Sequence, residues 1–260
     1  MDAWLPVSVL LLARDETQRI EALIPALSFA REVVVVWDPR GSVETRGAAE
    51  RLGARVFAHE FEGFGAQRQL ALAQCREPWV LWIDADERLD GTAVTALGRL
   101  AGPAAVKEAG FALDRRTHFL GRRIRFCGWR GETVVRVFRR ECARFDDAPV
   151  HERVFVEGSI GRLAGVLEHH SYAGWDDCVG KLVRYAHAGA RKARQAGRSA
   201  GPLDVLLRPP LRFVRMYVLQ LGFLDGFHGL LLCALATAQV FLKYGELWAS
   251  RDDRTPPGPR

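Results

Sequence analysis

The first hundred residues alternate short apolar runs with stretches of helical spacing, and this alternation restricts the fold more than any other feature of the chain. The runs 7–13 and 33–37 are rich in Val and Leu, as in strands buried on both faces. Two more strands are predicted over 55–58 and 79–83, with helices between the four over 20–27, 48–52 and 66–75. Such a repeat predicts an α/β fold with a parallel sheet and right-handed crossovers.

Polar residues follow each predicted strand. The first strand runs into Arg14-Asp15-Glu16, the second into Asp38, and a segment containing Arg68 precedes the helix that leads to the fourth. Open parallel sheets bind ligands beyond the carboxyl ends of their strands. Acids at one edge of the sheet, with a basic residue among them, therefore predict a nucleotide pocket.

The fourth predicted strand ends in Asp84-Ala85-Asp86-Glu87, which places three carboxylates within four residues. Two carboxylates separated by one small residue allow one of them to hold a hard divalent cation while the other contacts a neighbouring polar ligand. A departing nucleoside diphosphate needs its charge neutralised by such a cation. A solvated acidic turn has the same pattern, so the triplet alone is a weak signal.

Beyond residue 110 the pattern changes. Alternation broken by glycine over 110–166 predicts short, partly antiparallel strands. From Trp175 onward the chain is predicted to be helical, with Gly201-Pro202 and Pro209-Pro210 as interruptions. The predicted organisation is an α/β domain over 1–174, a helical region over 175–251 and a disordered tail with three prolines over 252–260.

Positive charge is concentrated in the helical region. The whole chain carries a formal charge of +6, whereas the stretch from Lys181 to Arg215 has nine Lys and Arg against one acid, Asp204. The apolar stretch 227–242 follows and is a little short of the ~20 residues that span a bilayer. A cationic amphipathic helix that runs into an apolar hairpin predicts a region lying in the cytoplasmic leaflet of an anionic membrane.

Other readings of the same region are a buried helix that covers the sheet and a dimer interface. Nucleic acid is a poor fit as a partner, because no recognition motif accompanies the charge.

The five cysteines are scattered and never spaced CxxC, which fits a reducing compartment without a zinc site. The apolar run 7–13 has no basic region before it, so we interpret it as a strand of a cytoplasmic protein and not as a signal peptide.

Seven short motifs follow one another along the chain. They are ARDE, VVVVWD, GFGAQRQLAL, WVLWIDADE, GW with a later E and VRVFRR, VHE, and GFLDGFHGL. In this order, over roughly residues 6–248, the chain resembles the family 2 inverting glycosyltransferases of the GT-A fold. It looks most like the lipopolysaccharide core β-1,4-glucosyltransferase-like branch, which implies a mixed sheet flanked by helices, a nucleotide diphosphate sugar donor such as a UDP-sugar, and a divalent cation, Mg²⁺ or Mn²⁺.

The resemblance also implies roles for individual residues. Asp86 matches the direct metal ligand, and His169, in a His-x-x-Tyr segment, falls near the metal or the diphosphate, although a histidine at a strand end is as often only hydrogen-bonded. After the second strand the chain departs from the family pattern Asp-Ser-x-Ser-x-Asp, in the segment that would contact the nucleobase. Nucleotide-sugar contacts fall on Asp15, Glu16, Asp38, Arg68 and Asp84.

The general base is assigned to one of two glutamates. Glu152 occupies the second position of an acidic pair in the wider family, and Glu132 replaces the acid of a Gly-Trp-x-Pro-Asp segment. His151 and Trp129 fall on the acceptor side. Trp129 would stack on a sugar ring, or it is a core residue.

The sequence therefore predicts a metal-dependent inverting hexosyltransferase, peripheral on the inner face of the bacterial cell membrane, that acts on a lipid-linked saccharide, the inner core of lipopolysaccharide. A polyprenyl phosphate acceptor and a non-catalytic nucleotide-sugar-binding scaffold are the alternatives. A dinucleotide-binding protein is disfavoured, because no GxGxxG follows any predicted strand.

Overall fold

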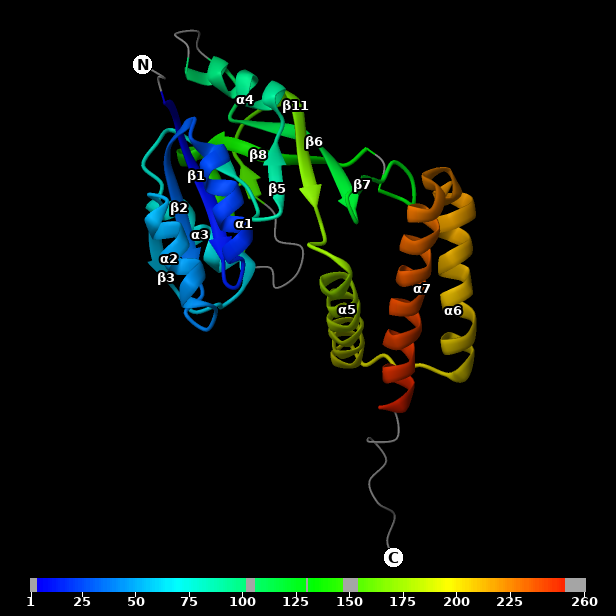
Figure 1. The fold of residues 1–260 in the computed structure, drawn as a ribbon. Helices are drawn as coiled ribbons and strands as arrows, with labels where there is room; N and C mark the ends of the chain where they lie inside the picture. Colours follow the sequence, from blue (N-terminus) through cyan, green and yellow to red (C-terminus); the bar gives the residue numbers. More distant parts are fainter. Residues whose placement is uncertain (1–3, 102–105, 130, 147–153, 251–260) are drawn as a thin grey trace, which may run out of the picture. The chain divides into compact units, whose positions relative to one another are not determined.

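The computed structural model describes residues 4–101, 106–129, 131–146 and 154–250 (Figure 1). The chain forms two compact units, one of residues 1–116 with 131–169 and one of residues 117–130 with 170–260. The domain boundary predicted after residue 174 stays a prediction. The compact units divide the chain differently, because residues 117–130 belong to the same unit as the carboxyl-terminal helices. The predicted tail, 252–260, lies outside the described residues.

The amino-terminal half of the first unit has the predicted strand–helix order. All strand pairs here are parallel, in the order β3-β2-β1-β4. The strands are β1 (Leu5–Ala13), β2 (Ala30–Trp37), β3 (Arg55–Ala58) and β4 (Trp79–Trp82). The helices are α1 (Thr17–Leu23), which continues as the 3₁₀ turn Ile24–Leu27, α2 (Val43–Arg51) and α3 (Phe64–Gln74).

Antiparallel strands extend this sheet, in the order β4-β8-β6-β11-β5, with β7 on β6. They are β5 (Glu87–Leu89), β6 (Gly110–Phe119), β7 (Arg122–Arg123), β8 (Thr133–Arg139) and β11 (Ile160–His170). β9 (Ala143–Phe145) and β10 (Val154–Val156) form a separate antiparallel pair, and α4 (Gly91–Gly98) follows β5. The mixed sheet flanked by helices that the resemblance implies is confirmed (Figure 1).

β11 is longer than the short strands that the glycine-broken pattern predicts. Gly165 lies inside the strand with φ +101°, and a Cβ there would come within 2.2 Å of the Ala93 backbone nitrogen. The glycine therefore allows α4 to approach the strand closely and does not end it.

Apolar clusters cover both faces of the sheet. Val7, Val9 and Leu11 of β1 belong to one cluster, with side chains of α1, α2 and α4. Leu10 belongs to the other, with Leu72 of α3 and with β9. Successive side chains of a strand point to opposite faces, so an uninterrupted apolar strand requires cover on both sides.

The second unit is mainly helical. It contains α5 (Trp175–Gln195), α6 (Pro202–Val214), a π-helical turn (Arg215–Leu219), a 3₁₀ turn (Gly222–Asp225) and α7 (Gly226–Ala249). α6 and α5 both pack along α7 (Figure 1). The prediction that Pro209-Pro210 interrupts the helical region is wrong, since both prolines lie inside α6 and Pro209 is buried. Packing against α7 outweighs the backbone hydrogen bonds that two interior prolines remove.

Asp225 has a structural role at the start of α7. It occupies the residue before α7, but its side chain makes no capping hydrogen bond. Instead the buried carboxylate accepts the backbone N–H groups of Arg125, at 3.0 Å, and Phe126, at 2.8 Å. This carboxylate therefore fixes the segment 117–130 to the start of α7.

We predict that Asp225→Ala lowers the free energy of unfolding of the second unit by about 2 kcal/mol or more, because two backbone N–H groups lose their acceptor. Asp225→Asn keeps one carbonyl oxygen and should lose less. Urea denaturation followed by circular dichroism measures both. Wild-type stability of the alanine variant would contradict the role given to this carboxylate.

Candidate active site

The loops that follow β1 and β2 are joined to one another, as expected for the carboxyl ends of neighbouring parallel strands. The Asp38 N–H donates to the Ala13 carbonyl at 3.0 Å, and the Ser42 N–H donates to Asp15 Oδ1 at 2.8 Å. A Cβ on Gly41 would lie 2.5 Å from the Arg14 carbonyl oxygen, so only glycine fits between the two loops. The structure thus brings the first two predicted acidic segments to one edge of the sheet.

Glu16 and Asp15 differ in what they can offer a ligand. Glu16 Oε2 accepts the backbone N–H groups of Arg14, at 2.6 Å, and Asp15, at 2.9 Å, so this carboxylate shapes its own loop. Asp15 is exposed and pairs with the neighbouring Arg14 side chain at 3.3 Å. Of the two acids, Asp15 is the more accessible to a nucleotide.

Asp38 is buried and engaged by Arg40. The guanidinium contacts both carboxylate oxygens at 3.0 Å, and these hydrogen bonds hold the pKa of Asp38 below its usual value. Arg40 Nη2 also donates to the Phe61 carbonyl at 3.2 Å. Arg40 stands in the segment that departs from the family pattern, so a nucleotide base that binds Asp38 has to compete with this arginine.

Asp84 is held by three donors at the end of β4. Oδ1 accepts from Trp82 Nε1 at 3.2 Å and from Arg68 Nη2 at 3.3 Å, and Oδ2 accepts from Arg136 Nη2 at 3.1 Å. Burial raises the pKa of Asp84, but the two guanidinium groups outweigh it and the net shift is downward. Both guanidinium groups also lie over the Trp82 ring, at 4.3 and 3.9 Å from its centroid.

Arg136 and Glu87 complete this cluster, and the sequence predicted a role for neither. Glu87 Oε1 accepts from Arg136 Nη2 at 2.7 Å, Glu87 Oε2 accepts the Asp84 N–H at 3.0 Å, and both side chains are buried. Burial raises the pKa of Glu87, while the two carboxylates beside Arg136 keep that guanidinium charged. A lone Arg within the apolar run Val134-Val135-Arg136-Val137-Phe138 was the available signal, because a buried cation requires a partner.

Asp86 lies beside His169 and Arg19. His169 Nε2 is 3.5 Å and Arg19 Nη1 is 3.6 Å from Asp86 Oδ2. The antiparallel pairing of β11 with β5 places His169 opposite Glu87 and so next to the DxD segment. Burial raises the pKa of Asp86, but the hydrogen bond and the charge of His169 outweigh it, so the carboxylate ionises below its usual pKa.

The side chains at this point fit a divalent cation with an incomplete set of protein ligands. Asp86 and His169 supply two donors of suitable type, and within the described ranges no three His, Cys, Asp or Glu side chains form a metal-binding group. Mg²⁺ is commonly held by one or two carboxylates together with substrate phosphates. The donors present therefore suit a cation whose remaining ligands come from a bound diphosphate and water.

The candidates for the base and the acceptor contacts are less fully described. Glu132 is partly exposed and accepts from Arg115 Nη2 at 2.7 Å. Trp129 belongs to the second unit, where it packs against a buried cluster and lines a cavity of about 100 Å³. Glu152 and His151 lie outside the described residues, so their roles stay predictions.

A parallel sheet extended by antiparallel strands, with a DxD segment where the two halves meet, defines the class of GT-A glycosyltransferases. The chain belongs to glycosyl transferase family 2, whose sequence model matches residues 8–144, just over half of the chain.

The chain is similar to several curated proteins over nearly its full length. It is 27% identical to the lipopolysaccharide core biosynthesis glycosyltransferase LpsC of Rhizobium meliloti (strain 1021), over 92% of this chain and 93% of that protein. It is 22% identical to an uncharacterized glycosyltransferase of Rickettsia prowazekii (strain Madrid E), over 93% and 86% of the two chains. These relatives are glycosyltransferases of comparable length.

Two solved structures match part of the chain at low sequence identity. A mycobacterial protein matches with a TM-score of 0.44 and 19% identity, over 71% of this chain and 74% of that one. Glucosyl-3-phosphoglycerate synthase from Mycobacterium tuberculosis, in complex with Mn²⁺, UDP and glucosyl-3-phosphoglycerate, matches with a TM-score of 0.36 and 21% identity, over 52% and 57% of the two chains.

We predict that Glu87→Gln lowers the free energy of unfolding by about 3 kcal/mol, because it removes one of the two anions that neutralise the buried Arg136. The matched control is Glu50→Gln on the surface of α2, where Glu50 pairs with Arg46 and a loss below about 0.5 kcal/mol is expected. Urea denaturation measures both variants. Equal effects of the two substitutions would show that the buried pair does not stabilise the site.

Proposed function

We propose that this chain is a metal-dependent inverting hexosyltransferase that moves glucose or another hexose from a nucleotide diphosphate sugar, preferably a UDP-sugar, to a lipid-borne acceptor, the inner core of lipopolysaccharide. The observation that carries the proposal is the placement of Asp86 beside His169, directly after an Asp84 that Arg68 and Arg136 hold in place. The similarity to LpsC over nearly the whole chain supports the lipopolysaccharide acceptor.

The donor site is proposed to divide its work between the two aspartates of the DxD segment. Asp86 and His169 would hold Mg²⁺ or Mn²⁺, which neutralises the charge that develops on the leaving diphosphate. Asp86 is better suited to this than Asp84, since its nearest cationic atoms are 3.5 and 3.6 Å away, whereas Asp84 accepts three hydrogen bonds. Asp84 is thereby fixed for a contact to the ribose or to a metal-bound water, which is preorganisation of the site.

Contacts to the base and ribose are proposed for Asp15, Glu16 and Asp38, and a nucleotide contact for Arg68. Asp15 is the most exposed of the three acids at the strand ends. Glu16 would act mainly by fixing the backbone of its loop. Asp38 would contact the nucleotide once Arg40 gives up its hydrogen bonds to the Asp38 carboxylate and contacts solvent or a phosphate instead.

In the proposed reaction Glu152 accepts the proton of the acceptor hydroxyl. The acceptor oxygen forms a bond to the anomeric carbon from the face opposite the nucleotide, and the bond from that carbon to the diphosphate oxygen breaks. One displacement of this kind inverts the anomeric centre. Glu132 is the alternative base, but Arg115 Nη2 already donates to its Oε2 at 2.7 Å, so an acceptor hydroxyl has to compete with this arginine. Trp129 and His151 are the proposed acceptor contacts.

The proposed location is the inner face of the bacterial cell membrane, because the acceptor is lipid-borne. A transfer assay that crosses a panel of nucleotide sugars with truncated lipopolysaccharide core and with polyprenyl phosphate tests the proposal directly. Transfer to the core supports it, and transfer only to polyprenyl phosphate moves the acceptor to the alternative. Metal-dependent donor binding without transfer to either would instead favour a non-catalytic scaffold.

We predict that Asp86→Asn abolishes transfer while the protein stays folded, because the amide keeps the shape of the side chain and loses its charge toward the metal. Transfer assays, with Mn²⁺ binding in the presence of UDP measured by calorimetry, check this outcome. Asp176→Asn makes the same change at an exposed position on α5 and should leave both quantities unchanged. Full activity of the Asp86 variant, or of the wild type in excess chelator, would remove the metal from the mechanism.

A second prediction separates the two candidate bases. Glu152→Gln should reduce kcat by about 10² or more and leave donor affinity near its wild-type value, since a general base acts in the transition state. Glu132→Gln should have a smaller effect on kcat. Steady-state kinetics and donor-binding calorimetry distinguish the two, and the reverse ranking would assign the base to Glu132.

A further inference from the structure

The second unit has an exposed apolar surface on α6. Six large aliphatic side chains of α6 and of the turn that continues it are between 47% and 69% exposed. They are Leu203, Leu206, Leu207, Leu211, Val214 and Val218, with exposed fractions of 69%, 65%, 53%, 65%, 47% and 49%. Their spacing of three, one, four, three and four residues places them along one face of the helix.

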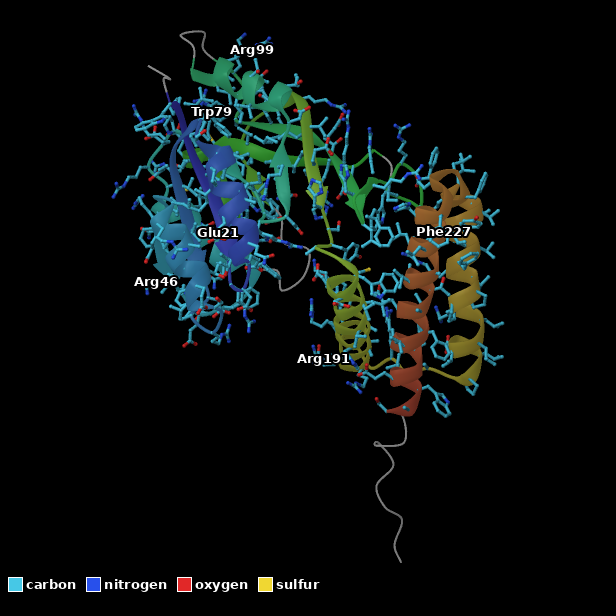
Figure 2. The ribbon with its side chains drawn as sticks, viewed as in Figure 1. Glu21, Arg46, Trp79, Arg99, Arg191 and Phe227 are labelled. Carbon is cyan, nitrogen blue, oxygen red and sulfur yellow. The ribbon has the colours of Figure 1, made fainter. Side chains whose placement is uncertain are left out.

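The opposite face of this helix is packed. Pro209 and Met216 are buried there, and Met216 belongs to the cluster that includes Leu232 of α7. Side chains project from α6 on the side away from α7 (Figure 2). The exposed stripe is therefore a second apolar face, which the packing of α6 on α7 leaves uncovered.

The apolar surface continues around the turn between α6 and α7. Leu219, Phe223, Leu224 and Phe227 are exposed, with Leu219 at 73% and Phe227 at 71%. The segment from 216 to 227 contains no Lys, Arg or Glu, and its one Asp, Asp225, is buried. Monomeric soluble proteins rarely expose contiguous apolar surface of this kind without a partner.

Arginines border the stripe. Arg208, Arg212 and Arg215 are spaced four and three residues apart, which places them together on one side of the helix, between the exposed and the buried face. Arg208 pairs with Asp204 at 2.6 Å, so the border carries a net charge of 3 − 1 = +2. An apolar face with a cationic border is complementary to the acyl chains and phosphates of an anionic leaflet.

We infer that the exposed face of α6 and the turn to α7 docks into one leaflet of an anionic lipid bilayer, with α6 in the plane of the membrane and the arginines at the level of the lipid phosphates. This deepens the proposed function, on which it rests for its purpose, by naming the surface through which the enzyme reaches a lipid-borne acceptor. A symmetric dimer through the same face is less favourable, because it would bring two cationic borders together.

The structure also indicates why α7 does not cross the bilayer. Residues Gly222–Ala249 form one helical stretch, long and apolar enough to span by length and composition alone. However, α5 packs along α7, with His187 Nδ1 2.6 Å from Glu246 Oε2 and Arg194 Nη1 donating to Ser250 Oγ at 2.5 Å. A spanning α7 would carry the charged α5 into the hydrocarbon or lose these contacts.

The sequence predicted a membrane-associating region over 175–251 and left open whether 227–242 enters the leaflet or packs as a core helix. Much of that predicted segment is in contact with α5 and α6, and Gly229, Leu232 and Cys233 are buried within it. The residues left exposed are mainly those of the preceding helix and turn.

Cosedimentation with phosphatidylcholine vesicles that contain phosphatidylglycerol tests the docking face. Leu206→Glu/Leu211→Glu should reduce the vesicle partition by about tenfold or more, because two leucines that would enter the leaflet become charged. The matched control is Val179→Glu/Val183→Glu, which adds the same charge at exposed apolar positions of α5 and should bind as the wild type does. The inference would be overturned if the α6 variant partitioned as the wild type does. It would also be overturned if the wild type were a dimer that does not bind vesicles and that dissociates on the α6 substitutions.

Salt and lipid charge test the arginine border. Arg212→Gln/Arg215→Gln should weaken partition to the anionic vesicles by about fivefold for each arginine and leave a remainder that salt does not reduce. Partition to pure phosphatidylcholine should not change. Equal losses on both kinds of vesicle would contradict the contact with lipid phosphates.

Protease access distinguishes docking from spanning. When the full chain is added to preformed vesicles, epitopes at both ends should remain open to external protease, and protection of the carboxyl-terminal epitope would show that α7 crosses.

Transfer to a water-soluble core fragment separates this inference from the proposed function. The α6 variant should retain that transfer, so failure of vesicle binding alone refutes the surface, whereas absence of transfer in the wild type refutes the function.

Discussion

One buried cation, Arg136, joins the parts of the site. Its guanidinium is 3% exposed and contacts both Asp84, after β4, and Glu87, at the start of β5. A buried charge that loses its partners is costly, so β8 and the loop after β4 stabilise one another. Because β4 closes the parallel half of the sheet and β8 opens the antiparallel half, the DxD segment takes its position only when both halves are assembled.

Three acids of the site already contact cationic side chains. The lengths of these contacts differ, and the roles that we propose for the acids follow this difference. Arg40 holds Asp38 through two hydrogen bonds, and Arg68, Arg136 and Trp82 hold Asp84. Among the described residues, Asp86 contacts His169 and Arg19 at the longer distances of 3.5 and 3.6 Å. The proposed divalent cation would therefore displace the fewest short contacts at Asp86. In the proposed mechanism, the arginines that neutralise these carboxylates would become available to the donor phosphates once the metal takes over part of that charge.

In the second unit, the packing of neighbouring helices decides which apolar side chains of α6 stay exposed. The carboxylate of Asp225 fixes the segment 117–130 to the start of α7, and α7 in turn packs against both α5 and α6. This packing uses one side of α6 and leaves the apolar stripe on its other side exposed. The surface proposed to dock on a membrane is thus a consequence of how three helices share their apolar faces.

The sequence by itself determined the strand–helix order and the acids at the strand ends, because periodicity and strand termini are local properties of the chain. It placed Asp15, Asp38, Asp84 and Asp86 correctly at one edge of the sheet. Only the tertiary structure decided which charges pair, since the partners of Asp84 and Glu87 come from α3 and β8. It also decided that Gly165 continues a strand, that Pro209-Pro210 lies within a helix, and that α6 presents the exposed apolar face. Each of these depends on a neighbouring element that is distant in sequence, and no local pattern records which face such a neighbour covers.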